Sequence, residues 1–316
     1  MKFRTEIPLV KSNFPMDYQS KILLMGSCFA ENIGEKFQYF KFQSEINPFG
    51  IIFNSTSLLN LLRRSVQKRY FTSEDVFYHN DLWHCFEVHS ELSNTNRDVF
   101  LENLNRLVDD VNTQAHTITH LQITLGTAWV YRAIASNEIV ANCHKVPQKE
   151  FNKELLSVAS ITNDLHEIIG MLNNINPSCK IVFTISPVRH IKDGYIENTV
   201  SKAHLITAVN AVVREYNSKV EYFPSFEIMM DELRDYRFYS EDMLHPNQVA
   251  VDYIWSQFVQ NYLSNSAFEL MREVDAIQKG LAHRSFNEET ESHQKFLKNL
   301  SNKILNLNKK LPHITF

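Results

Sequence analysis

Short apolar runs alternate with longer amphipathic stretches along most of the chain. The runs have the length of buried strands and lie at residues 21–25, 121–125, 180–185 and 220–223. Between them, apolar residues recur every three or four positions, the period of a helix with one buried face. These helical stretches cover residues 28–40, 58–62, 96–116, 150–174, 200–217 and 247–262. Strands that alternate with helices in this way predict parallel βαβ units.

We therefore predict a three-layer α/β/α sandwich around a mostly parallel sheet of about five strands. A hairpin is expected over residues 76–86, because two aromatic-rich runs flank residues 79–81, which have the composition of a turn. Ser55 or Ser57 is expected to cap the second helix, and Pro246 to occupy the first position of the last core helix.

The composition of the chain changes at about residue 262. Residues 1–262 carry the α/β pattern, whereas residues 263–316 are rich in Asn, Lys, Glu and His and form a predicted helical C-terminal extension. One narrow apolar stripe repeats at helical spacing in this tail. It consists of Phe296, Leu300, Ile304, Leu307 and Leu311. The stripe either packs back on the domain or forms the seam of a homodimer.

Composition and charge narrow the classes of function. The chain has 316 residues, of which 44% are hydrophobic and 22% charged, as in globular proteins. The net charge of -4 argues against a nucleic-acid-binding protein, which normally has a basic excess. No apolar run approaches the ~18 residues of a membrane-spanning helix. The chain begins without the apolar segment of a signal peptide, and its four cysteines have no CxxC spacing, so we expect a cytoplasmic protein.

Cys28 and Ser27 lie where the first strand turns into the first helix, directly after Gly26. A thiol at a helix N-terminus faces the positive end of the helix dipole and free N–H groups, which lower its pKa and favour the reactive thiolate. The same N–H groups can stabilise an oxyanion. Cys28 is therefore a candidate nucleophile, with a buried structural cysteine as the alternative. Ser27 is the rival nucleophile, although a serine here is also an ordinary helix cap.

Asp242 and His245 come just before the last helix of the core. In a tight loop this spacing lets a carboxylate reach imidazole Nδ1 and leaves Nε2 for a nucleophile. The alternative is a turn aspartate and a helix-entry histidine, because Asp-x-x-His is a weak motif. Arg189 and His190 directly follow the strand at residues 180–185, where they either bind an anionic group or are solvated.

Asn142, Cys143 and His144 form a polar cluster between apolar residues. Cys143 and His144 belong to the residue types that bind metals, and a metal-dependent enzyme using them with Cys28 and His245 is one alternative. Sequence neighbours rarely chelate one ion together, so we expect neither a metal nor another cofactor. His144 is also a candidate substrate-binding residue.

Six fragments, in this order, resemble the GSCFA family, which is named for the run at residues 26–30 and is grouped with the SGNH/GDSL-type hydrolases. They are MGSCFAENIG, NPFGIIFN, TLGTAWVY, ANCHKVP, FTISPVRH and DMLHPNQVAVDYIW. The resemblance covers about residues 15–262, and the tail after residue 265 carries none of it. It implies a flavodoxin-like, mostly parallel sheet and the chemistry of esterases and acyltransferases.

The resemblance also implies a catalytic set. Aligned with the Gly-Asp-Ser block of SGNH enzymes, Cys28 takes the position of the nucleophilic serine and Ser27 that of the aspartate. The Asp-x-x-His block of the superfamily matches Asp242 and His245. A Cys-His-Asp triad of this kind is chemically workable and would form a thioester intermediate.

The oxyanion hole implied by the resemblance is less complete. Gly50 best matches the glycine whose N–H contributes to it, and the Gly-x-Asn block begins at Gly126. In that block Ala128 replaces the expected asparagine, a loss that typically costs ~10²–10³ in rate unless another donor takes over. Asn142 and Asn54 are the candidates for that role.

Acyl hydrolysis on a small molecule or glycan is the function that these features predict. Cys28, or Ser27 in its place, would attack the acyl carbonyl, His245 would carry the proton, and Asp242 would orient His245. Arg189 and His190 would bind a substrate carboxylate or phosphate. Two alternatives stay open: an acyltransferase of the same fold, and a non-catalytic binding module, which the missing asparagine favours.

Overall fold

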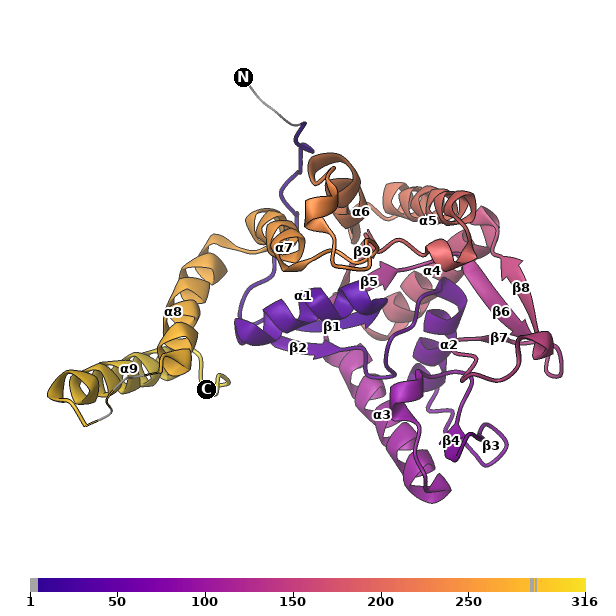
Figure 1. Ribbon diagram of the computed structural model, residues 1–316, viewed down its shortest axis with the longest axis horizontal. Coiled ribbons are helices and arrows are strands. Elements are labelled where there is room, and N and C mark those ends of the chain that lie inside the picture. The colour runs from indigo at the N-terminus through magenta and orange to yellow at the C-terminus, as the bar shows by residue number, and fades with distance from the viewer. Residues whose placement is uncertain (1–4, 285–286, 288) are drawn as a thin grey trace.

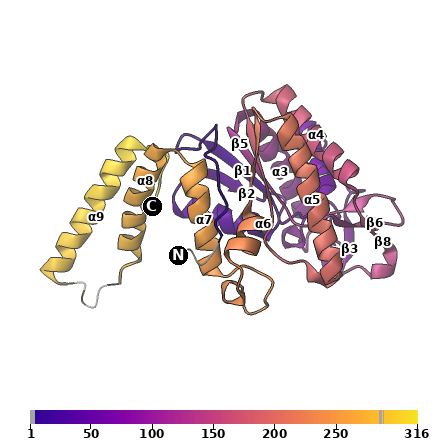
Figure 2. The ribbon, with the colours of Figure 1, turned by 90° about the horizontal axis from the view of Figure 1, so that it is seen from above.

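The computed structural model describes residues 5–284, 287 and 289–316 (Figures 1 and 2). Its centre is a parallel sheet of five strands in the order β10-β9-β5-β1-β2. The strands are β1 (Lys21–Gly26), β2 (Gln43–Ile46), β5 (His120–Leu125), β9 (Lys180–Ile185) and β10 (Val220–Phe223). Counted along the chain this is the flavodoxin-like order 2-1-3-4-5. The predicted fold class is confirmed.

Alternating side chains of the sheet belong to two hydrophobic layers, one on each face. In β1, Leu23 and Met25 belong to the core on one face, and Ile22 and Leu24 to the core on the other. The first face is covered by α2 (Ser55–Val66), α3 (Arg97–Thr117), α4 (Val158–Ile175) and α5 (Tyr195–Glu215). The second face is covered by α1 (Cys28–Tyr39) and α7 (Gln248–Tyr262).

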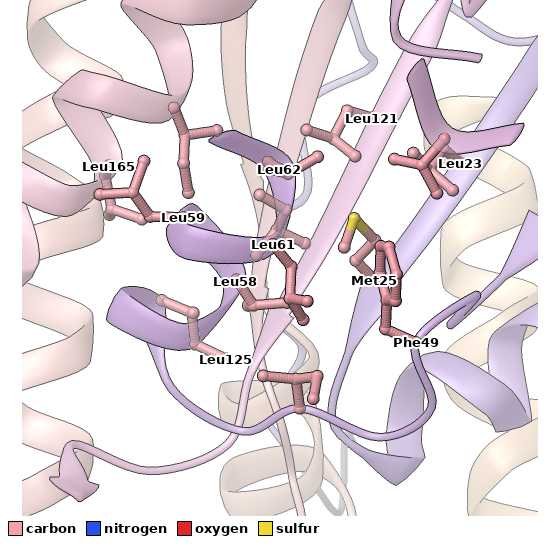
Figure 3. Close-up of a cluster of buried hydrophobic side chains, with 14 of the residues drawn as sticks. Leu23, Met25, Phe49, Leu58, Leu59, Leu61, Leu62, Leu121, Leu125 and Leu165 are labelled. Carbon is pink, nitrogen blue, oxygen red and sulfur yellow. The ribbon is translucent and has the colours of Figure 1, made fainter. Parts of the chain in front are cut away.

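A leucine-rich face of α2 packs onto the middle of the sheet (Figure 3). Leu58, Leu61 and Leu62 are fully buried there, close to Met25 of β1. Each such side chain contributes roughly 1.5–3 kcal/mol when it leaves water. Phe49 joins the same cluster from the loop between β2 and α2. This loop is therefore anchored at the carboxyl edge of the sheet.

The helix predicted over residues 150–174 is wrong at its start. Phe151–Leu155 is a strand, β8, which pairs antiparallel with β6 (Trp129–Ala133) in a small sheet that also contains β7 (Ile139–Val140). The helix begins only at Val158, after the cap residue Ser157. Pairing with β6 therefore outweighs the helical pattern of apolar residues.

Two predicted helix starts are wrong because asparagine caps the helices instead. The side chain of Asn54, rather than Ser55 or Ser57, caps α2 by accepting a hydrogen bond from the Ser57 N–H at 2.8 Å. Asn247 caps α7 in the same way, so Pro246 lies outside that helix. Both starts fit the strong preference of asparagine for cap positions.

The hairpin predicted over residues 76–86 is present. It consists of β3 (Phe77–His79) and β4 (Leu82–His84), which pair antiparallel. The two turn residues, Asn80 and Asp81, both have positive φ, as a two-residue hairpin turn requires. Strand β2, by contrast, was not predicted, because this edge strand is polar and only half buried.

The C-terminal extension is a helical hairpin beside α7, made of α8 (Asn265–Ala282) and α9 (Glu291–Lys310) (Figures 1 and 2). Of the predicted stripe, Leu300, Leu307 and Leu311 are buried within this chain, in a cluster with Met271 and Val274 of α8. The stripe therefore packs back on its own chain, which removes the seam that the homodimer interpretation required.

An N-terminal segment runs alongside the connection between α7 and α8. The Ser12 N–H donates to the Asn261 carbonyl at 2.8 Å, and the Ser264 N–H donates to the Met16 carbonyl at 2.9 Å. Between them, Met16 and Leu263 form a parallel bridge. The segment thus fixes the start of the C-terminal hairpin to the domain.

Candidate active site

The loops at the carboxyl edge of the sheet are joined by backbone hydrogen bonds. Each bond connects the end of a strand, or the segment that follows it, to a neighbouring segment. The N–H groups of Ile52, Gly126, Ser186 and Arg189 donate to the carbonyls of Gly26, Phe53, Leu125 and Leu244, respectively, at 2.8–3.2 Å. Ligands of doubly wound sheets bind at this edge.

The turn from β1 into α1 is held against β5. The Ser27 N–H donates to the Thr124 carbonyl at 3.0 Å. Gly26 has a φ of +139°, and a Cβ at this position would lie 2.1 Å from the Thr124 carbonyl oxygen, so no residue with a side chain fits here. This close approach places Cys28 at the first position of α1, at the edge of the sheet.

The two candidate nucleophiles differ in accessibility. Cys28 is partly exposed, whereas Ser27 is fully buried. Ser27 occupies the N-cap position of α1, but its hydroxyl makes no capping hydrogen bond and has no partner within the described residues. Of the two side chains, only that of Cys28 is thus open to solvent. The geometry thus disfavours Ser27 as nucleophile and places it at the helix N-cap that we considered, although without the side-chain hydrogen bond of an ordinary cap.

The expected thiolate at Cys28 is not supported. Burial raises the pKa of this thiol, and the carboxylate of Glu31 raises it further. The ammonium of Lys202 and the N–H groups of Cys28 and Phe29 act in the opposite direction. The helix terminus does stabilise the thiolate as predicted, but desolvation is the larger effect. Cys28 is therefore a neutral thiol at rest and needs a base to become a nucleophile.

Asp242 and His245 form the contact that their spacing predicts. Nδ1 of His245 lies 2.6 Å from Oδ2 of Asp242. Oδ1 of Asp242 accepts the N–H groups of Leu244 and His245 at 2.9 and 3.0 Å. These backbone hydrogen bonds, together with the histidine, lower the pKa of Asp242 to about 2. The carboxylate is thus ionised at any ordinary pH and fixes the orientation of the imidazole.

Lys202 is a central residue of this edge that was not predicted. Its side chain is only 2% exposed, and Nζ donates to the carbonyls of Gly126 and Ser186, both at 2.7 Å. Burial lowers the pKa of Lys202 to about 7, opposed by its interaction with Cys28. Lys202 stands on the same helical stripe as Leu205 and three further core residues of α5. A lysine at a position where the helical pattern predicts a buried apolar residue was the signal in the sequence that could have identified Lys202.

His190 is not the anion-binding cation that we expected. It is mostly buried, its ring packs edge-on against Phe53 with 5.4 Å between the ring centroids, and it lies close to Gly126. Burial lowers its pKa to about 3, and the charges of Lys202 and His245 contribute in the same direction. His190 is therefore neutral, and its buried Nε2 has no hydrogen-bond partner within the described residues.

The backbone donors proposed for the oxyanion hole are already in use. The Gly50 N–H donates to the Asn47 carbonyl at 2.7 Å in a tight turn, and the Gly126 N–H donates to the Phe53 carbonyl at 2.8 Å. Neither group is free for an oxyanion in this arrangement. The Cys28 N–H at the start of α1 remains, where it faces its own sulfur.

The Asn142–His144 cluster is structural. Oδ1 of Asn142 accepts the His144 N–H at 2.8 Å, and Nε2 of His144 lies 2.7 Å from the Cys85 carbonyl. The His144 ring also packs against His84, with 4.6 Å between the ring centroids. Burial lowers the pKa of His144 to about 4, so it is a neutral core histidine and not an exposed substrate ligand.

The four residues of the metal-dependent alternative are not brought together as a ligand set. Among residues 5–284, 287 and 289–316, no three His, Cys, Asp or Glu side chains are arranged to hold a metal ion. Cys143 and His144 point into the small sheet region, in contact with Phe86 and its neighbours. The residues described thus provide no preformed metal site at Cys28.

The fold and the residues at the carboxyl edge of its sheet define a doubly wound α/β protein. Cys28 lies at a helix N-terminus there, and Asp242 and His245 form a hydrogen-bonded pair. The chain belongs to the GSCFA family, whose model matches residues 21–258. A second model, described as the GSCFA domain protein C-terminal domain, matches residues 274–316. The tail, which we expected to lie outside the resemblance, therefore matches a family domain of its own. No curated protein matches the chain.

Replacing Glu31 by glutamine is expected to lower the pKa of Cys28 and to speed its alkylation near neutral pH. The reason is that the variant removes a negative charge that opposes the thiolate. The measurement is the rate of iodoacetamide modification of Cys28 against pH, followed by mass spectrometry. Glu35→Gln, an exposed change one turn further along α1, is the matched control. Equal shifts in both variants would show that Glu31 has no specific effect.

Proposed function

We propose that the protein hydrolyses or transfers an acyl group through Cys28, with His245 as general base and Asp242 as its orienting partner. The observation that carries this proposal is the Asp242–His245 hydrogen bond of 2.6 Å on the loop joined to the same sheet edge as Cys28. A carboxylate held ionised beside Nδ1 is what a histidine base needs. The SGNH-type relationship implied by the sequence motifs assigns the same three residues.

The raised pKa of Cys28 decides how the proton moves. A neutral thiol attacks the acyl carbonyl while its proton passes to Nε2 of His245, which forms the C–S bond and a tetrahedral oxyanion. The C–O or C–S bond to the leaving group then breaks, and the leaving group takes that proton. The product is a thioester on Cys28. Water or an acceptor hydroxyl attacks it next, again with His245 as base, and releases the acyl group together with the free thiol.

The acyl acceptor, water or a hydroxyl group, distinguishes a hydrolase from an acyltransferase, and both share the first half-reaction.

The Cys28 N–H contributes to holding the oxyanion. Asn54, the residue after Phe53, is the proposed side-chain donor in place of the missing asparagine at position 128. Its Oδ1 caps α2, whereas its Nδ2 makes no hydrogen bond within the described residues.

The proposed compartment is the cytoplasm. All four cysteines, at positions 28, 85, 143 and 179, are free thiols, as a reducing compartment favours. In the part of the chain that the structure describes, the helices are too short or too polar to cross a bilayer.

Acyl-enzyme formation tests the proposal directly. The protein is mixed with an aryl acetate or an acetyl thioester, quenched in acid, and analysed by intact-mass spectrometry and peptide mapping. We expect one acetyl group on Cys28, no such adduct in Cys28→Ala, and an unchanged rate in Ser27→Ala. His245→Ala should slow acylation by at least ~10², the scale of general-base catalysis. An adduct that persists in Cys28→Ala would assign the nucleophile to another residue, such as Ser27, whereas no adduct in the wild type would support the binding-module alternative.

A further inference from the structure

A cavity of about 540 Å³ lies next to the candidate active site, between α5 and the segment at residues 226–239. This volume is in the range of small-molecule sites. Its interior is formed by Ile206, Phe226, Met229 and Leu233, which are apolar. The cavity therefore suits the hydrocarbon part of a ligand.

Two residues connect the cavity to the active-site edge. Lys202 lines it from α5, and the ammonium group of the same side chain binds the Gly126 carbonyl and interacts with Cys28. Arg189 lines it from the loop after β9, and the Arg189 N–H donates to the carbonyl of Leu244, next to His245. A ligand in the cavity thus lies beside the catalytic loop.

Arg189 is a cation without an acidic partner among the described residues. Its guanidinium contacts the Met243 carbonyl at 3.4 Å and lies 5.8 Å from the ring centroids of both Tyr195 and Tyr239. Buried Arg64, by contrast, is paired with Asp75 and Glu87. An arginine held between aromatic rings with its charge unpaired is a common anchor for an anion.

The other charged side chains that line the cavity do not neutralise the positive charge of Arg189. Arg234 also lines it, and the acidic Asp235 is already engaged with Arg237. Exposed apolar side chains gather around the same region: Tyr195, Ile196, Tyr236 and Met243 are all more than two-fifths exposed. A positively charged rim around an apolar interior matches an amphiphilic anion.

We propose that this cavity binds an aliphatic anion, with the carboxylate or phosphate on Arg189 and the chain against Phe226 and Met229. The proposed function gives this ligand its role, because a medium-chain carboxylate is the product that hydrolysis of a fatty acyl-Cys28 thioester would release. Binding itself requires no turnover. The two proposals therefore fail separately, because Cys28→Ala abolishes acylation and leaves the cavity intact.

The test is isothermal titration calorimetry of the full chain with octanoate, octyl phosphate and the neutral octanamide, all below their micellar concentrations. We expect one site for an octyl anion, with octanamide at least tenfold weaker. The tighter of the two anions identifies the headgroup. Equal binding of octanamide, or no binding of either anion at millimolar concentration, would overturn the proposal.

Three variants locate the site. Arg189→Gln should weaken binding of the anion at least tenfold and leave octanamide unchanged. Ala203→Trp, an exposed change on the cavity wall, should weaken all three ligands by filling the space. Arg214→Gln, at the far end of α5, is the matched charge control and should bind like the wild type. Equal losses in Arg189→Gln and Arg214→Gln would mean attraction by net charge alone, which contradicts the proposal.

Discussion

Between pH 7 and pH 10, the wild-type protein is expected to gain stability relative to the Lys202→Met variant. The pKa of Lys202 is lowered from 10.5 to about 7 in the folded protein, because the ammonium group is buried. Below pH 7 both folded and unfolded chains carry this proton, so the cost of burying the charge is complete. Above pH 7 the folded protein releases it and the unfolded chain keeps it, so the free energy of unfolding rises with pH.

The size of this effect makes it measurable. The difference between wild type and variant should grow by up to ~1.4 kcal/mol per pH unit over that window. Urea denaturation midpoints at pH 7, 8 and 9 for both proteins supply the measurement. Lys295→Met, on the exposed side of α9, is the control and should show a constant difference. A constant difference for Lys202→Met as well would mean that Lys202 keeps its ordinary pKa in the folded protein.

Loss of His245 is expected to reduce acyl turnover by at least ~10³, and Asp242→Asn by ~10²–10⁴, because the amide favours the wrong imidazole tautomer. The double variant should be no slower than His245→Ala, since residues that act as a unit are not additive. Steady-state hydrolysis of an aryl ester or thioester measures all three. Multiplying losses in the double variant would indicate that Asp242 acts independently of His245.

The pH dependence of this reaction provides a second check. Asp242 has a pKa of about 2 and is ionised throughout the working range, so it cannot produce the acidic limb of the rate profile. That limb should therefore persist in Asp242→Asn. Its disappearance in this variant would assign the limb to the carboxylate and contradict the hydrogen-bonding pattern at Oδ1.

Most of the sheet could be predicted from the sequence because its central strands are buried on both faces. Runs such as residues 121–125 and 181–185 are continuously apolar or uncharged and end at glycine or at Ser-Pro, so their length and their boundaries identify them. The spacing of Asp242 and His245 allowed their contact, but Asp-x-x-His is a weak motif, and the resemblance to SGNH enzymes was what favoured it. Cys28 was placed at the helix start by Gly26, which marks the turn.

The features that escaped prediction depend on partners distant in sequence. Phe151–Leu155 has a helical apolar pattern and becomes a strand only because β6 is available. The pKa of Cys28 is raised mainly by burial, which no local pattern reveals. Glu31, the next cause, is a sequence neighbour, whereas Lys202, which lowers this pKa, lies 174 positions further along the chain. The hydrogen bond from the Gly50 N–H to the Asn47 carbonyl likewise depends on how the turn folds. Neither the pairing of distant strands nor the desolvation of a side chain can be inferred from the type of a residue alone.

The parallel contact between residues 12–16 and 261–264 has a mechanical consequence. Tension applied to the chain from both sides would first peel α9 and α8 away, because these helices lie beyond the contact. The hydrogen bonds at Met16 and Ser264 would then be loaded together in shear rather than one at a time. The contact would act as a clamp that carries the load before the five-stranded sheet does, and a pulling experiment should show a small early event followed by one large rupture.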